Sequence, residues 1–162
     1  MKTLLVCYSY HHKNTAKIAH VIATILKADV KTPEQVEPKK MQKYDLVGFG
    51  SGIYANMHHE SLIDLADTLP RVNNKKAFIF STCGIPSFTM SSGYVRGYIQ
   101  KAHTPLRERL LSKGYTIVDE FNCVGFNTHG FLKLFGGINR GRPNAKDLHT
   151  AEEFARNLGV IL

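Results

Sequence analysis

The chain has 162 residues, of which 43% are hydrophobic, and a formal net charge of +8 at pH 7. This length suits one domain covering residues 1–162, the composition argues against disorder, and no apolar run approaches the roughly 20 residues of a membrane-spanning helix. The positive charge suits an acidic protein partner, but no lysine- and arginine-rich block interleaved with aromatic residues is present, so we do not expect nucleic-acid binding.

The cysteines indicate a reducing compartment. Cys7, Cys83 and Cys123 are odd in number, lie far apart and form no C-x-x-C pair. A disulfide framework is therefore not expected. The first predicted strand begins almost at Met1, which leaves no room for a secretion leader. We expect a cytoplasmic protein.

Strands and helices are predicted to alternate along the chain. Apolar runs predict five strands, at about residues 3–8, 29–31, 45–50, 77–80 and 116–124. Apolar residues at helical spacing predict helices at about 16–26, 62–69, 105–114 and 144–158. Residues 81–103 are predicted to form a long functional loop, and 127–142 show no clear period. This alternation predicts an α/β fold, a three-layer αβα sandwich around a five-stranded parallel sheet.

Helix ends carry their own signals. Pro105 stands where a helix can begin, and Gly114 stands where one can end. Asn144, followed three residues later by Asp147, resembles a capping box at the start of the last helix. These residues therefore set the predicted bounds of the last two helices.

Ligands of such sheets bind beyond the carboxyl ends of the strands, where the winding of the chain reverses. Three loops are predicted to meet there: Ser9–Thr15, Ser51–Met57 and Ser81–Tyr94. All three are rich in Ser, Thr, Gly, Asn and Tyr. We therefore expect one binding site at this edge of the sheet.

The first loop is predicted to bind a phosphate. It opens a helix, whose first N–H groups lack partners and carry partial positive charge. The alternative is an ordinary polar helix cap. The sequence G-x-x-x-x-G-K-[ST] is absent, and Ile53 stands where G-x-G-x-x-G requires glycine, so neither nucleotide motif applies. The candidate phosphate ligands are Ser9, His11, His12, Lys13, Asn14 and Thr15.

The other two loops are predicted to hold a flat ligand. Glycine lets the backbone approach a ring closely, and a tyrosine offers a ring for stacking. The alternative for the second loop is a plain glycine turn. In the third loop we expect Cys83 to be a small, space-limited residue rather than a reactive thiol. The candidate residues are Ser51, Gly52, Ile53, Tyr54, Ala55, Thr82, Cys83 and Gly84.

Two histidine pairs, His11-His12 and His58-His59, raise the question of a metal site. Adjacent residues on a helix or strand point apart, so a pair does not chelate from one face. No acidic or cysteine ligand spacing accompanies either pair. We expect no metal site.

The order strand, S-Y-H-H-K-N-T, helix resembles the flavodoxin phosphate signature, S/T-x-T-G-x-T. The segment Gly141-Arg-Pro-Asn-Ala-Lys-Asp, followed by a helix rich in Ala and Phe, is similar to the tail of many flavodoxin-family proteins. The chain departs from the family at His12 and Lys13, where small residues are usual, and in its positive charge. The Ser51-Gly-Ile-Tyr loop is also similar to that of the protoporphyrinogen-oxidase-type branch.

The resemblance implies the strand order 2-1-3-4-5 and FMN as the cofactor. It implies that the first loop holds the phosphate, while Gly52, Ile53, Tyr54 and the 82–84 segment contact the ring. The implied function is electron transfer between cytoplasmic partner proteins, which the positive charge suggests are acidic. One alternative is an oxidase or reductase for a quinone- or porphyrinogen-like molecule, with Phe88, Met90 and Tyr94 shaping its pocket. The other is a flavin-free module that binds a phosphate ligand. The oligomeric state is not indicated.

Overall fold

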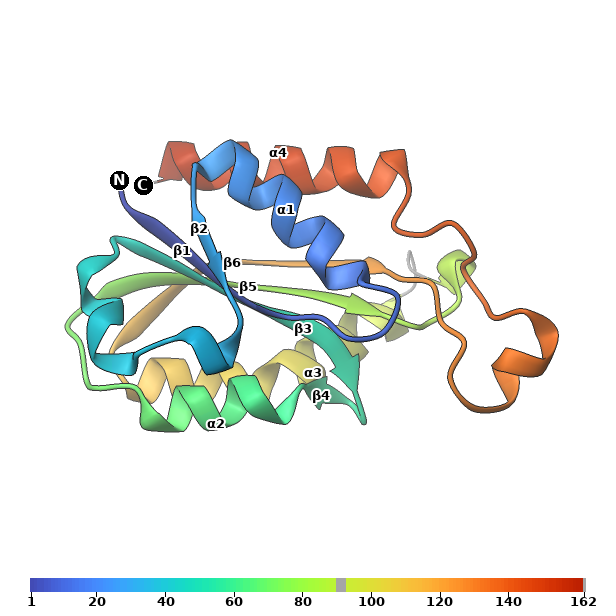
Figure 1. The fold of residues 1–162 in the computed structure, drawn as a ribbon, viewed down its shortest axis with the longest axis horizontal. Helices are drawn as coiled ribbons and strands as arrows, with labels where there is room; N and C mark the ends of the chain where they lie inside the picture. Colours follow the sequence, from blue (N-terminus) through green and yellow to red (C-terminus); the bar gives the residue numbers. More distant parts are fainter. Residues whose placement is uncertain (90–92, 162) are drawn as a thin grey trace.

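The computed structural model describes residues 1–89 and 93–161, and it is a parallel sheet between two layers of helices (Figure 1). The strands hydrogen-bond in the order β2-β1-β3-β5-β6, and β4 pairs antiparallel with β3 outside this path. Counted in chain order, the five parallel strands have the order 2-1-3-4-5, so the expected fold is confirmed. The strands are β1 (Thr3–Tyr8), β2 (Asp29–Lys31), β3 (Leu46–Tyr54), β4 (Met57–His58), β5 (Lys75–Cys83) and β6 (Tyr115–Val124).

Helices cover both faces of the sheet, α1 and α4 on one and α2 and α3 on the other (Figure 1). The α-helices are α1 (Asn14–Leu26), α2 (Glu60–Thr68), α3 (Gly93–Ser112) and α4 (Ala145–Ile161). Four 3₁₀ helices lie in the connections: η1 (Pro33–Gln35), η2 (Pro38–Lys43), η3 (Ser87–Thr89) and η4 (Gly130–Phe135). None of the helices in the described part of the chain is both long and apolar enough to cross a membrane.

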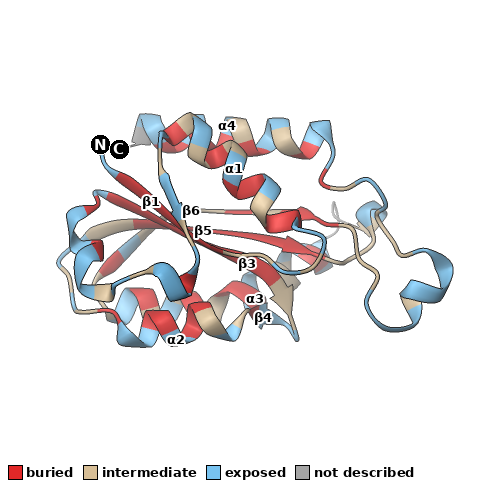
Figure 2. Ribbon diagram, viewed as in Figure 1, coloured by how far each residue is buried: buried red, intermediate tan, exposed pale blue. Residues whose placement is uncertain are grey.

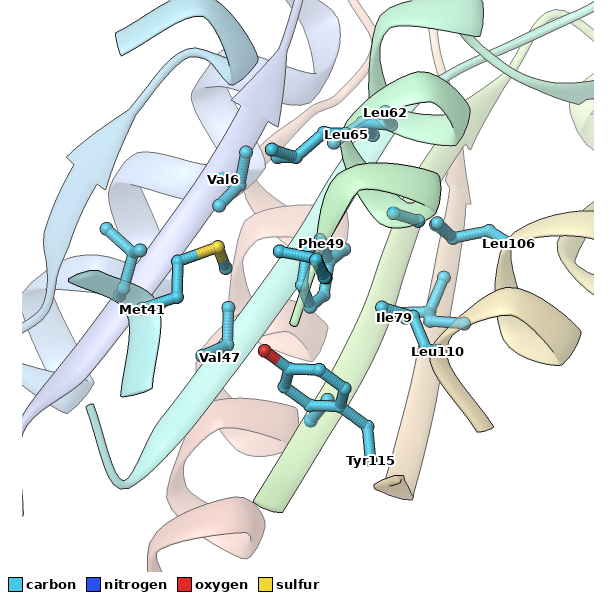
Figure 3. Packing of buried hydrophobic residues seen from close by; sticks show 14 of the residues in the cluster. Val6, Met41, Val47, Phe49, Leu62, Leu65, Ile79, Leu106, Leu110 and Tyr115 are labelled. Atoms are coloured by element: carbon cyan, nitrogen blue, oxygen red, sulfur yellow. The ribbon is translucent and has the colours of Figure 1, made fainter. Parts of the chain in front are cut away.

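The central strands β1, β3 and β5 divide their apolar residues between the two layers. Phe49 and Ile79 pack with α2 and α3 in one buried cluster (Figure 3), while Phe78 and Phe80 pack with α1 and α4 in the other. Because both faces are covered, the central strands are almost continuously apolar, and they are buried along most of their length (Figure 2). The two clusters hold the sheet rigid up to its carboxyl edge.

The predicted cap of the last helix is confirmed. The Asn144 side chain accepts hydrogen bonds from the amides of Lys146 and Asp147 at 3.1 and 3.3 Å. In return, Asp147 Oδ2 accepts one from the Asn144 amide at 2.8 Å. This reciprocal pair fixes where the chain enters α4.

The prediction of a loop over 81–103 was wrong for its second half, because α3 begins at Gly93 and Pro105 lies inside it. The buried residues of its first three turns include Ala102 and His103, which are small or polar. The helical spacing of apolar residues is therefore weak in this part of α3, and Pro105 resembles the first residue of a helix. Met90 lies outside the described residues.

The prediction of a loop over Ser51–Met57 was also wrong. Strand β3 continues to Tyr54, turns at Ala55 and Asn56, which have φ angles of 46° and 66°, and returns as β4. Two-residue hairpin turns with two positive φ angles usually carry Asn-Gly or Asp-Gly. The Ala-Asn pair hides the turn from sequence analysis.

Candidate functional site

A cavity of about 540 Å³ opens at the carboxyl edge of the sheet, within the range of small-molecule sites. It joins the ends of β1, β3 and β5, as the sequence predicted, with the segment that follows β6. Ten of the fourteen candidate residues line it: His11, Asn14, Thr15, Gly52, Ile53, Tyr54, Ala55, Thr82, Cys83 and Gly84. Ser9, His12, Lys13 and Ser51 are not part of its lining.

The first loop turns tightly into α1. His12 and Lys13 both have positive φ angles, 52° and 55°, so residues with side chains adopt a conformation that glycine adopts more easily. Ser9 Oγ accepts a hydrogen bond from the Ala16 amide at 3.0 Å, and Lys13 Nζ donates one to the Ser9 carbonyl at 3.2 Å. Ser9 and Lys13 therefore hold the loop itself together.

Asn14 and Thr15 begin α1 and are both buried at the cavity wall. Asn14 Nδ2 donates to the Phe126 carbonyl at 2.8 Å, while its Oδ1 is buried without a hydrogen-bond partner. Thr15 Oγ1 lies 2.8 Å from Thr82 Oγ1. A Cβ on Gly125 would lie 2.5 Å from Asn14 Nδ2, so only glycine fits there without a shift. These contacts fasten the helix start to the ends of β5 and β6.

The two loop histidines are held by the segment after β6. His11 Nε2 and His12 Nε2 lie 3.2 and 2.8 Å from Thr128 Oγ1, and the His12 ring is 4.3 Å from that of Phe126. Burial lowers the pKa of His11, and charge on His12 or His129 lowers it further. His11 is therefore disposed to act as a neutral hydrogen-bonding group rather than as a cation.

Tyr54 lies between the first two loops. Its ring covers Gly52, where a Cβ would come within 2.9 Å of it. Burial raises the pKa of Tyr54, and the backbone amides of Tyr10 and His11, which face its hydroxyl, oppose that effect. The amides of the first loop therefore face an oxygen atom.

Ser51 faces the protein interior, although the sequence made it a candidate ligand. Its hydroxyl donates to the Gly52 carbonyl at 2.7 Å, accepts from the His59 amide at 3.0 Å and lies 2.9 Å from His58 Nδ1. The reason is the hairpin: pairing with β4 brings His58 alongside the end of β3. Ser51 therefore supports the wall of the cavity from behind.

The cysteines show no sign of reactivity. Cys83 lines the cavity but is 3% exposed, its Sγ donates to Asn122 Oδ1 at 3.6 Å, and burial raises its pKa. Burial also raises the pKa of Cys7, to about 12, and that of Cys123. Since the thiolate is the reactive form, all three thiols are best understood as packing groups.

Behind β5 lies a buried polar network that sequence analysis missed. Ser81 Oγ is 2.8 Å from His103 Nε2, and His103 Nδ1 donates to Glu120 Oε2 at 2.8 Å. Arg107 also binds Glu120, and Asn122 Nδ2 donates to Ser81 Oγ at 2.7 Å. This order of groups resembles that of a hydrolytic triad, but Ser81 has no exposed surface, so no substrate reaches it. The network fixes the position of the strand that carries Thr82 and Cys83.

Sequence analysis also missed the segment after β6, which supplies Gly125, Phe126, Asn127 and His129 to the cavity. The rule that ligands bind at carboxyl strand ends applies to β6 as well, so that signal was available. Within residues 1–89 and 93–161, no three His, Cys, Asp or Glu side chains gather where they could hold a metal ion.

Three similarities place the chain among known proteins. A family model described as a flavodoxin domain matches residues 5–123. An uncharacterized protein of Methanocaldococcus jannaschii is 45% identical over 158 residues, which are 98% of each chain.

Two solved structures share the fold at lower identity. Oxidised Flavodoxin 2 from Bacillus cereus has a TM-score of 0.71 at 18% identity and covers 100% of both chains. Fusobacterium nucleatum flavodoxin, solved bound to flavin mononucleotide, has a TM-score of 0.65 at 11% identity and covers 100% of this chain and 99% of its own. The match of the family model over most of the chain shows that the protein belongs to the flavodoxin domain family.

Proposed function

We propose that the protein binds FMN in this cavity and carries electrons between partner proteins in the cytoplasm. The observation that carries the proposal is the convergence of the ends of β1, β3 and β5 and the segment after β6 on one cavity, with the amino end of α1 at its wall. Membership of the flavodoxin domain family and an FMN-bound structural neighbour support the choice of ligand.

The residues present fit both ends of FMN. The amides of Tyr10 and His11 face the Tyr54 oxygen and lower the pKa of its hydroxyl, so they point to a place where an oxygen ligand could bind. Asn14 Oδ1 is buried without a partner and could accept a hydrogen bond from an O–H or N–H of the ligand. None of the described residues that line the cavity is acidic. Gly52 and Gly84 bring backbone to the cavity wall, and the Tyr54 ring and the Asn127 side chain pack against them. No acidic side chain therefore opposes an anionic ligand here, and a flat ring would meet backbone together with the Tyr54 ring.

The bound flavin would supply the redox chemistry, and the chain would bind and orient it. Thr15 and the loop amides would hold the phosphate at the helix start, while Asn14 would support the site through its hydrogen bond to the Phe126 carbonyl. Tyr54 would flank the ring on one side, and the 82–84 segment would contact its edge. The buried networks behind Ser51 and Ser81 would keep both walls in place.

Electron transfer is favoured over turnover of a small substrate. Phe88 and Tyr94, expected to shape a substrate pocket in the alternative reading, are 84% and 83% exposed and do not line the cavity. The positive net charge supports acidic redox partners. The three free, buried cysteines agree with a reducing cytoplasm.

The test is a titration of the purified protein with FMN and, separately, with riboflavin, which lacks the phosphate. We expect one FMN per chain, quenched flavin fluorescence and weaker binding of riboflavin. Protein that takes up neither ligand would leave the flavin-free binding module as the better reading. Rapid reduction of a quinone by the reduced protein alone would contradict the carrier role.

A matched pair of variants tests the phosphate site. Thr15→Val removes a buried hydroxyl at the helix start, while Thr24→Val removes one from the exposed face of the same helix. A hydrogen bond to a charged group is worth about 1.5–3 kcal/mol, so Thr15→Val should weaken FMN binding about tenfold or more. Riboflavin binding should change little in either variant. Equal losses for both ligands would place the phosphate elsewhere.

A further inference from the structure

Exposed apolar side chains gather beyond the cavity. Seven large hydrophobic residues in the described part of the chain are more than 70% exposed, and six of them lie in or beside the connections at the carboxyl edge of the sheet. Five belong to two segments. Phe88 in η3 and Tyr94 at the start of α3 are 84% and 83% exposed, and Phe131, Leu134 and Phe135 in η4 are 71%, 84% and 79% exposed. Clusters of this kind mark interaction sites on soluble domains. We call these five residues the apolar rim.

The loop that carries three of them projects from the body of the molecule, past the end of the sheet (Figure 1). Backbone hydrogen bonds within this loop define its conformation. Asn127 and Ile138 pair at its base through two backbone hydrogen bonds of 3.0 and 2.9 Å, and the Gly137 amide donates to the Leu132 carbonyl at 2.8 Å. Its tip is the short helix η4, in which residues three apart share a face. Phe131 and Leu134 therefore point the same way.

One side chain joins the two loops. Asn139 Nδ2 donates to the Ile85 carbonyl at 2.7 Å, and its Oδ1 accepts from the Ser87 amide at 2.8 Å. Phe88 is thus tied to the loop that carries Phe131. Because these hydrogen bonds tie the two loops together without a partner, binding one costs less conformational entropy.

The charge around the rim has one sign. The sequence contains no Asp or Glu in 68–107 or in 121–146, the stretches that carry the rim. Lys133, Arg140 and Arg96 are exposed there. A second copy would bring like charges together, whereas an acidic surface would complement them.

We infer that the apolar rim and these cations form the docking surface for an acidic redox protein. Phe131 and Leu134 act as the apolar anchors, and the cations steer the encounter. The inference rests on the proposed function, because docking here brings the partner next to the cavity: His129, which lines it, directly precedes η4. It adds to that function the surface and the residues that recognise the partner.

The test is a titration of the FMN-loaded protein with a purified acidic [4Fe–4S] ferredoxin at low and high salt. Basic cytochrome c serves as the counter-probe. We expect micromolar or tighter binding of the ferredoxin that weakens as salt rises, and no binding of cytochrome c. Phe131→Ser/Leu134→Ser should weaken binding about tenfold or more, and Lys133→Glu should slow association and flatten the salt dependence.

Matched control variants carry substitutions of the same kinds, apolar to serine and lysine to glutamate, at exposed positions outside the apolar rim. Val30→Ser/Val160→Ser removes two exposed apolar side chains far from the rim, and Lys39→Glu reverses an exposed charge in η2. Both controls should bind the ferredoxin as the parent protein does. Circular dichroism and FMN uptake should be unchanged in all four proteins, since none of the substituted residues lines the cavity.

Several outcomes would overturn the inference. Rim variants that bind the ferredoxin within twofold of the parent would show that the rim is not the docking surface. Rim-dependent binding to phosphatidylglycerol vesicles without ferredoxin binding would assign the surface to a membrane, and a rim-dependent dimer in sedimentation would assign it to a second copy. The titration is repeated on FMN-free protein, so failed FMN uptake would refute the proposed function while docking is still decided.

Discussion

The Glu120 carboxylate is the charged centre of the network behind β5, and replacing it with glutamine gives a prediction that depends on pH. Its side chain is 24% exposed and contacts both Arg107 and His103. Burial by itself would raise the pKa of Glu120, but the hydrogen bonds from His103 and Arg107 outweigh it and lower the pKa from 4.5 to about 2. Glutamine keeps the size of the side chain and removes only the charge.

The size of the effect follows from this shift. Lowering a pKa from 4.5 to about 2 corresponds to at most about 3 kcal/mol of folding free energy. Because the folded pKa lies below the unfolded one, this stabilisation is complete above pH 4.5 and is lost as the pH falls toward 2. Glu120→Gln should therefore destabilise the protein by about 3 kcal/mol at pH 7, and this difference should shrink by about 2 kcal/mol at pH 3.

Urea unfolding followed by far-UV circular dichroism, repeated from pH 7 to pH 3, measures the difference. Glu37→Gln is the matched control, because Glu37 pairs with Lys40 on the exposed surface. The control should change the free energy of unfolding little at any pH. A difference between Glu120→Gln and the parent that stays constant with pH would refute the assigned ion pair and place the cost in packing.

Three further measurements test the site itself. Tyr54→Phe removes the oxygen that the amides of Tyr10 and His11 face. Since one hydrogen bond is worth about 1 kcal/mol, freeing these amides should leave the FMN dissociation constant unchanged or lower it about fivefold. A tenfold weakening in a fluorescence titration would show instead that the hydroxyl supports the bound state. Ala55→Gly relieves a residue with a φ angle of 46°. The relief of about 1–2 kcal/mol exceeds the entropy cost of about 0.5–1 kcal/mol, so thermal unfolding should shift upward by about 2 °C. A lower midpoint would contradict the assigned turn. Finally, the net charge of +8 should make the lower-potential couple of bound FMN less negative than in acidic flavodoxins. Two unit charges about 10 Å apart interact by roughly 1.7 kcal/mol at an effective dielectric constant of about 20. An equally negative or lower value in a potentiometric titration would refute this reasoning.

Sequence patterns predicted correctly those features of the site that depend only on neighbouring residues. The polar turn before Asn14 marks a helix start because unpaired amides need partners, whatever the rest of the fold. The same holds for Asn144 and Asp147, whose cap is complete within four residues. The features that sequence analysis missed have no signal in the neighbouring residues. The turn at Ala55 and Asn56 lacks glycine, and the start of α3 buries His103 in place of an aliphatic residue.

The amino-acid sequence by itself determined the alternation of strands and helices, and with it the edge of the sheet where the candidate residues meet. Periodicity and helix caps are properties of neighbouring residues, so they are readable one segment at a time. Only the tertiary structure decided which side chains face the cavity. Ser51 turns inward because β4 folds back beside it, and the segment after β6 enters the cavity because Asn14 and His12 bind it there. These orientations depend on residues far apart in the chain, whose contacts exist only after the sheet has formed.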